Sequence, residues 1–287
     1  MNISRSVPDS GRPATTSVTP VHPAEARPGW MNLLLPVLVG LLVLAPAQTR
    51  GAANDSATLL PVAQYKNPGP NRTGNNYYYA SAPIPGTEKV GIAASGQEDF
   101  LLYQGSSFTT RRMDPLIYHR DIVWEAGGRR AVLGGSRLPP DTGGVLLQYN
   151  RDRQRFSVLA ETPVNVLGVT RRDDTILAVG GQRQPNRTGA IYRYRDGNLD
   201  SLESPTDSVY QSIEWGPEGR RALIVGEAGT VVEWRGPDRN TVHTIPGRPF
   251  LKSLDWHPSG RHALIGGEQG RLYRFEDGEI TRISLSM

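Results

Sequence analysis

Five similar units follow one another from Tyr77 to the end of the 287-residue chain. Aligned on Trp256, the equivalent positions in the earlier units are Trp215, Thr170, Trp124 and Pro83. The spacings between these positions are 41, 45, 46 and 41 residues, which suits a unit of four short strands and their turns. A chain with this period is expected to fold as a row of repeated sheets.

The last unit, residues 250–283, shows the pattern most plainly. Four short apolar runs are separated by turn sequences, which are Pro258-Ser259-Gly260, Glu268-Gln269-Gly270 and Asp277-Gly278. Asp-Gly between apolar runs is a strong hairpin signal. The third run ends in an aromatic residue in every unit, and these residues are Phe275, Trp234, Tyr194, Tyr149 and Tyr103. The second runs begin at Ala263, Ala222, Leu177, Ala131 and Val90. Each unit is therefore predicted to be a four-stranded antiparallel meander.

These runs are apolar on both faces, so a single sheet would leave one apolar face in water. A ring of sheets covers both faces and leaves only short edges. The sequence predicts an all-β fold, a β-propeller of five four-stranded blades at about residues 77–115, 118–161, 164–206, 209–246 and 250–287. A closed narrow ring is favoured, and an open arc that dimerises is the alternative.

The motif that starts at Trp256 carries a family resemblance. Trp256-x-Pro-x-Gly-Arg, a small apolar strand, Gly-Gly and Gly-x-Leu-Tyr-x-Phe resemble WD40-like propeller repeats. The turn is also similar to the Ser-Pro-Asp-Gly-Arg turn of TolB-like propellers. The repeats lack the Gly-His pair and the Trp-Asp dipeptide of true WD40 units, so the resemblance implies the architecture and no particular subfamily.

The N-terminal part has a different composition. Residues 1–30 are polar, rich in Pro, Ser and Thr, and predicted to be disordered. Residues 31–47 form an uncharged apolar run that ends in Ala45-Pro46-Ala47. This run is interpreted as a signal peptide; a retained membrane anchor and a buried core segment are the alternatives. The first two readings predict an extracytoplasmic location (secreted, periplasmic or anchored at the outer face of the cytoplasmic membrane), and Met31 is an alternative start.

Residues 48–76 are interpreted as a linker. Within it, 58–62 (Thr-Leu-Leu-Pro-Val) could form a strand. If each repeat supplies all four strands of its own blade, this strand belongs to none of them. It could instead pair along an outer edge and act as a latch between the two chain ends.

Charge and composition exclude several kinds of partner and site. The net charge of +4 falls to about +2 without residues 1–50, which leaves no concentrated basic face for nucleic acid. There is no cysteine, so disulfides and thiolate metal sites are excluded. No metal site, no cofactor and no membrane contact other than residues 31–47 are predicted.

No catalytic motif stands at a suitable spacing, and a non-catalytic protein is predicted. Glu214 and Asp255, each before a tryptophan, are the only candidates for a glycosidase-like carboxylate pair. Hydrogen bonds that cap the blades are the favoured explanation for them. Trp124, Trp215 and Trp256 are interpreted as packing residues between blades, and the alternative is a sugar-binding platform.

The second and third units are longer than the others in the loop between the second and third runs. The extra residues lie within 136–143 and 182–189. Insertions that map to one face of a repeat protein often mark its binding face. A protein or peptide partner is predicted there, with a glycan as the alternative. The candidate binding residues are Arg137, Asp141, Arg183, Asn186, Arg187 and Arg248.

Overall fold

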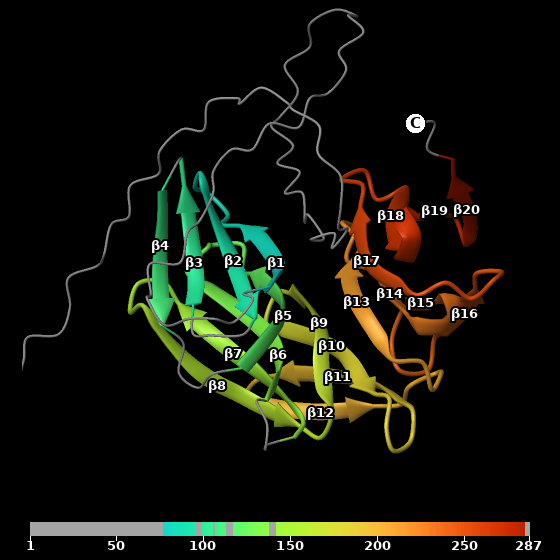
Figure 1. The fold of residues 1–287 in the computed structure, drawn as a ribbon, viewed down its shortest axis with the longest axis horizontal. Helices are drawn as coiled ribbons and strands as arrows, with labels where there is room; N and C mark the ends of the chain where they lie inside the picture. Colours follow the sequence, from blue (N-terminus) through green and yellow to red (C-terminus); the bar gives the residue numbers. More distant parts are fainter. Residues whose placement is uncertain (1–76, 96–98, 106, 113–116, 138–141, 285–287) are drawn as a thin grey trace, which may run out of the picture.

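The computed structural model confirms an all-β propeller of five four-stranded antiparallel blades (Figure 1). It describes residues 77–95, 99–105, 107–112, 117–137 and 142–284. The predicted disordered tail, apolar run, linker and 58–62 strand lie outside these residues. In the described part, no helix is both long enough and apolar enough to cross a bilayer.

Each blade is a simple meander in which the strands pair in chain order. The strands of blade 1 are β1 (Tyr77–Pro83), β2 (Lys89–Ser95), β3 (Asp99–Gln104) and β4 (Ser107–Arg112). Those of blade 2 are β5 (Ile117–Trp124), β6 (Arg130–Arg137), β7 (Gly144–Asn150) and β8 (Arg155–Thr162). Those of blade 3 are β9 (Asn165–Arg172), β10 (Thr175–Gln182), β11 (Thr188–Arg195) and β12 (Asn198–Leu202).

The last two blades have short 3₁₀ turns between their second and third strands. Blade 4 consists of β13 (Tyr210–Trp215), β14 (Ala222–Gly226), η1 (Glu227–Gly229), β15 (Thr230–Trp234) and β16 (Asn240–Thr244). Blade 5 consists of β17 (Leu251–Trp256), β18 (His262–Gly267), η2 (Glu268–Gly270), β19 (Leu272–Glu276) and β20 (Glu279–Ile283). Every described blade therefore takes its four strands from one sequence repeat.

The first strand of each blade lies on the inner side of the propeller. β1, β5, β9, β13 and β17 contact one another in sequence, whereas the fourth strands β12, β16 and β20 have mostly exposed residues. Each first strand also carries a β-bulge near its start, for example between Tyr210 and Ser212 and between Leu251 and Ser253. A bulge increases the local twist of a strand, so its recurrence gives every blade the same inner geometry.

The core consists of the layers of side chains between neighbouring blades. Between blades 1 and 2, Trp124 packs with Phe100 and Tyr149, whose rings are 4.8 Å apart. Between blades 4 and 5, Trp256 lies in one apolar cluster with Leu223 and Val225 of blade 4, and it meets Phe275 of its own blade edge to face. These contacts confirm that the repeated tryptophans pack between blades.

Side-chain oxygen atoms also connect the inner strands of successive blades. The Asp121 carboxylate accepts the N–H of Val169 at 2.8 Å, which joins blades 2 and 3. The Thr170 hydroxyl accepts the N–H of Trp215 at 3.3 Å, and the Glu214 carboxylate accepts the N–H of Trp256 at 2.9 Å. Three successive junctions thus each have a side chain that satisfies a backbone donor of the next blade.

In the third repeat, the strand pairing shows that the sequence alignment was wrong by one residue. The third-strand aromatic lies opposite Ala222 in blade 4 but opposite Ile176, not Leu177, in blade 3. Ile176 pairs with Arg171, so Arg171, and not Thr170, occupies the tryptophan position. The hairpin of blade 3 turns over Asp173 and Asp174, with Asp173 in the left-handed region (φ 52°). Because this turn is two residues shorter than the corresponding turns, an alignment with a constant hairpin length was wrong here.

The row of blades has two ends. Extensive contacts join blades 1 and 2, 2 and 3, 3 and 4, and 4 and 5. Among the described strands, β17–β20 make no comparable contact with β1–β4, and these two blades stand apart in Figure 1. The favoured closed ring is thus not formed by direct packing of blade 5 on blade 1.

Candidate binding face

The loops between second and third strands lie on the same face as the connections between blades. The N–H of Gly229, in the η1 turn, donates to the carbonyl of Pro249, and the N–H of Ile245 donates to the carbonyl of Gly229. Gly229 itself has φ +68°, and a Cβ there would lie 3.1 Å from the Cα of Arg248. The connection that contains Arg248 is therefore packed directly against the blade 4 loop.

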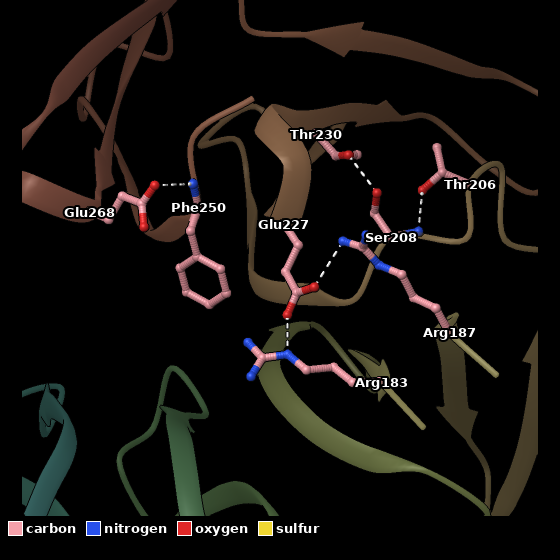
Figure 2. A network of polar contacts seen from close by, with 8 residues as sticks. All are labelled: Arg183, Arg187, Thr206, Ser208, Glu227, Thr230, Phe250 and Glu268. Atoms are coloured by element: carbon pink, nitrogen blue, oxygen red, sulfur yellow. Dashed lines mark hydrogen bonds and ion pairs between the residues drawn. The ribbon is translucent and has the colours of Figure 1, made fainter. Parts of the chain in front are cut away.

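Glu227 is the centre of a polar cluster on this face. Its carboxylate accepts a hydrogen bond from Arg183 Nε at 2.5 Å and another from Arg187 Nη2 at 2.8 Å (Figure 2). The Glu227 side chain is 11% exposed, whereas those of Arg183 and Arg187 are 64% and 43% exposed. A buried carboxylate with two charged donors is well satisfied, so the extended loop of blade 3 is anchored on blade 4.

Phe250 extends this cluster towards blade 5. The guanidinium carbon of Arg183 lies 5.5 Å from the centre of its ring, and the Lys252 ammonium lies 5.7 Å from it. Both distances fall within cation–π range. The backbone N–H of Phe250 donates to Glu268 Oε1 at 3.4 Å, as Figure 2 shows. The face thus has an aromatic ring with two cations close to it.

The structure separates the sequence-predicted residues into two groups. Arg183, Asn186, Arg187 and Arg248 belong to the two segments that meet at Glu227, and all four are exposed. The backbone carbonyl of Asn186 accepts a hydrogen bond from the Thr188 hydroxyl. Arg137 lies in blade 2 and forms an ion pair with Glu161 at the end of β8. Asp141 lies outside the described residues.

Four residues of this face were not among the predicted ones: Glu227, Phe250, Lys252 and Glu268. Glu227-Ala228-Gly229 and Glu268-Gln269-Gly270 stand at equivalent places in their repeats, and both turns have a central residue in the left-handed region. That repetition is visible in the sequence. The pairing of Glu227 with arginines 40 and 44 residues earlier is not, because it requires two blades to be adjacent.

The inner strands carry two carboxylates, Glu214 and Asp121, whose pKa values are raised. Burial raises the pKa of Glu214 to about 8, and the charges of Asp255 and Asp121 add to the effect. Burial likewise raises the pKa of Asp121 to about 7, against the hydrogen bonds from Val169 and Ile122. Glu214 and Asp121 both accept backbone N–H groups of the following blade. These bonds give both carboxylates a structural role, of the kind that the sequence interpretation favoured for Glu214.

Other candidate groups are used in packing. Trp124 and Trp256 are 7% and 5% exposed. His119 is fully buried in β5, and burial lowers its pKa to about 3, so its ring is neutral at pH 7. Within the described ranges, no group of three or more metal-ligating side chains is arranged to hold an ion.

Comparison with known proteins relates the chain to others through its fold. No protein family matches the sequence, and no curated protein matches it. A chain in the crystal structure of a nidogen/laminin complex is similar in structure, with a TM-score of 0.57 and 15% sequence identity. The match covers 69% of this chain and 75% of that one. Because 1134 solved chains match in this way, the likeness establishes a β-propeller fold and leaves function to the site.

Proposed function

We propose that this protein is a non-catalytic, extracytoplasmic propeller that binds a protein or peptide through the loop face around Glu227. The observation that carries this proposal is the pair of arginines that Glu227 holds beside Phe250. Both guanidinium groups keep unused N–H donors, and their side chains are 64% and 43% exposed. Preorganised cations beside an aromatic ring are suited to carboxylates and apolar groups of a polypeptide.

The charge of the surrounding surface indicates the chemistry of the partner. Exposed Arg248 and Lys252 add two cations to the two arginines, and Glu227 and Glu268 are the nearby carboxylates. Glu227 is already neutralised, so the face has an excess of positive charge. We expect a partner segment that presents acidic residues with an aromatic or aliphatic side chain among them.

The similarity to a chain of the nidogen/laminin complex supports a protein partner by analogy, since that propeller was crystallised with another protein. The resemblance to WD40-like and TolB-like repeats agrees with it, because propellers of both kinds are rigid scaffolds. The predicted signal segment at residues 31–47 supports an extracytoplasmic location. Mass spectrometry of the mature N-terminus tests that location.

A peptide library displayed on phage, selected against the full chain, tests the binding face. Alanine at Arg183 or Arg187 would remove one of the two partners of the buried Glu227 carboxylate. The informative variant is therefore Arg248→Glu with Lys252→Glu, which leaves both of these contacts in place. We expect enriched peptides to bind this variant at least about tenfold more weakly, the effect of roughly 1.4 kcal/mol.

The matched control is Arg220→Glu with Arg261→Glu. It makes the same charge change at exposed arginines in the turns between first and second strands, on the opposite face. Equal losses in both variants would show a general charge effect and refute the assignment to this face. Failure to enrich any peptide would refute the peptide-binding function.

The glycan-binding and glycosidase alternatives remain predictions. A glycan array tests the first. A substrate panel on the Glu214→Gln, Asp255→Asn variant tests the second, and loss of a measurable activity there would replace the non-catalytic proposal.

A further inference from the structure

A small pocket lies on the face opposite the Glu227 loops, where the first turn of blade 4 meets the first turn of blade 5. Its volume is about 190 Å³. Its walls come from the turn between β13 and β14, from Arg235 directly after β15, and from Gly260 in the turn between β17 and β18. The two first turns are in contact, since a Cβ on Gly260 would lie 3.6 Å from Glu218 Cγ. The pocket is therefore part of the junction between two blades.

Arg221 is the fixed cation of this pocket. Its side chain is only 20% exposed, and its guanidinium carbon lies 4.9 Å from the centre of the Trp256 ring and 5.6 Å from that of Phe275. Both distances are in cation–π range. Its Nη1 donates to Glu233 Oε2 at 3.1 Å, and this is the only hydrogen bond that its side chain donates within the described residues. An arginine has five N–H donors, so Arg221 is held in place and still has donors for a ligand.

Glu233 positions the cations without removing the positive charge. Its side chain is 7% exposed, and its carboxylate accepts hydrogen bonds from Arg221 and, at 3.4 Å, from Arg235 Nη2. His243 Nε2 lies 3.2 Å from the other carboxylate oxygen. Burial acts to raise the pKa of Glu233, but the hydrogen bonds from His243, Arg221 and Arg235 outweigh it and lower this pKa. One ionised carboxylate is thus shared between two guanidinium groups.

The rest of the pocket does not balance this charge. Exposed Arg220 and exposed Glu218 also line it. Three guanidinium groups and two carboxylates, Glu233 included, leave an excess of one positive charge at the pocket. Charge-assisted hydrogen bonds are roughly twice as strong as neutral ones, so an anion is the ligand that these walls favour.

The other blades have no such arrangement among their described strands. The place of Glu233, opposite the second residue of the second strand, is held by Gln148, Arg193 and Arg274 in blades 2, 3 and 5. In blade 1 it is held by Leu102. A buried carboxylate that positions an arginine is therefore not a requirement of the blade fold, and blade 4 differs from its relatives at this point.

We infer that this pocket binds the oxyanion group of a small molecule, with Arg221 as the fixed donor and Arg235 as an adjustable one. The Arg235 side chain is 57% exposed and its hydrogen bond to Glu233 is long, so it can turn towards a ligand at little cost. The planar guanidinium fork matches the oxygen atoms of carboxylates and phosphates. The volume lies below the range of about 300–1,000 Å³ that is usual for drug-sized ligands, which favours a small molecule.

Isothermal titration calorimetry of the full chain tests the inference with sodium phosphate, sodium sulfate and sodium acetate, each at the same ionic strength maintained with chloride. We expect saturable binding of at least one of these oxyanions. Stronger binding of phosphate or sulfate would identify a tetrahedral group as the ligand, and stronger binding of acetate would identify a carboxylate. Absence of saturable binding for all three would overturn the inference.

Arg235→Gln is the informative variant, because Glu233 keeps its contacts with Arg221 and His243. We expect the dissociation constant of the bound oxyanion to rise about tenfold, the usual effect of one charge-assisted hydrogen bond. The matched control is Arg239→Gln, which removes the same charge from an exposed position in the same hairpin, outside the pocket. Equal weakening in both variants would show a general charge effect and overturn the site.

Arg221→Lys provides a second test, which separates the guanidinium fork from its charge. The lysine keeps a positive charge beside Glu233 and loses the fork. We expect oxyanion binding to fall at least about tenfold while the melting temperature confirms that the variant is folded. Wild-type affinity in a folded Arg221→Lys variant would overturn the role of Arg221 in the site.

Discussion

Blades 4 and 5 have similar sequences and different surroundings. Both contain an acidic residue before a tryptophan, an Ala-Leu-Ile second strand and a Glu-x-Gly turn. In blade 4, Leu223 is fully buried, Glu214 accepts an N–H from the next blade, and Glu227 binds two arginines. In blade 5, Leu264 is 41% exposed, Asp255 is exposed, and the Glu268 carboxylate accepts a backbone hydrogen bond of 3.4 Å from Phe250.

The comparison shows that the sequence of one repeat determines the strands of a blade. The burial and the contacts of its residues depend on the neighbouring blades. The Glu-x-Gly turn of blade 4 binds two arginines because the preceding blade, blade 3, has an extended loop that reaches it. Blade 4 has no such loop, so the turn of blade 5 lacks this contact. The contact between Glu227 and the two arginines is therefore a consequence of one insertion in blade 3, packed against an otherwise regular blade 4.

The largest difference in unfolding free energy is expected between alanine variants of the equivalent residues Leu223 and Leu264. Leu223→Ala is expected to lower the free energy of unfolding by about 3 kcal/mol, since it removes a fully buried side chain. Leu264→Ala should lower it by less than about 1 kcal/mol, because this side chain is 41% exposed. Urea denaturation of the two variants measures both values, and equal losses would show that the two faces are equally covered.

A pH effect should distinguish Glu214 from Asp255. Because the folded pKa of Glu214 is raised to about 8 from its ordinary 4.5, the fold favours the protonated acid. The stabilisation is complete below about pH 4.5 and is lost as the pH rises towards 8, on the order of 5 kcal/mol in all. Glu214→Gln, which stays neutral and can still accept the Trp256 N–H, should reduce this slope.

The slope that remains in Glu214→Gln combines a fall with pH from Asp121, whose pKa is raised to about 7, and an opposite contribution below about pH 6.5 from His119, whose pKa is lowered to about 3. Asp255→Asn should reduce the slope less than Glu214→Gln does, because it removes only a charge that adds to the effect of burial on Glu214. Chemical denaturation between pH 4.5 and 8.5 provides the measurement. A slope unaffected by Glu214→Gln would contradict the protonated state of that side chain at neutral pH.

The smallest effect is expected at the two turn glutamates. Glu227→Gln should lower stability by about 1 kcal/mol, because it weakens two charge-assisted hydrogen bonds to arginines that are themselves exposed. Glu268→Gln should change it by less than about 0.5 kcal/mol. Hydrogen exchange of residues 183–188 adds a local measurement, and it should increase in Glu227→Gln alone.

The repeat pattern predicted the number of blades, the order of their strands and the packing of the tryptophans. This prediction succeeded because every blade must place apolar side chains at the same positions between its neighbours. The third-strand aromatic residue is one of these positions, and it recurs in each repeat. The prediction was wrong by one residue in the third repeat, where a shorter hairpin shifted Thr170 and Leu177 relative to their counterparts. A turn can lose two residues without changing the sheet, so spacing alone does not reveal the shift.

The candidate site was predicted in part. The extended loop of blade 3 supplied Arg183 and Arg187, whereas Glu227 and Phe250 come from other repeats and were missed. Arg137 is in the same predicted set, yet its ion pair is with Glu161 of its own blade. Residue type and loop length indicate which side chains are exposed, and they do not indicate which charges from different blades meet.

By itself, the sequence determined a propeller of five four-stranded blades, because period, turn residues and two-faced apolar strands admit few other arrangements. Only the tertiary structure decided that Glu227 holds two arginines, that Asp121, Thr170 and Glu214 join successive blades, and that Leu264 of blade 5 is exposed while Leu223 of blade 4 is buried. The physical reason is that blade formation depends on local pairing within about 40 residues. Contacts between blades depend on which side chains the completed packing brings together.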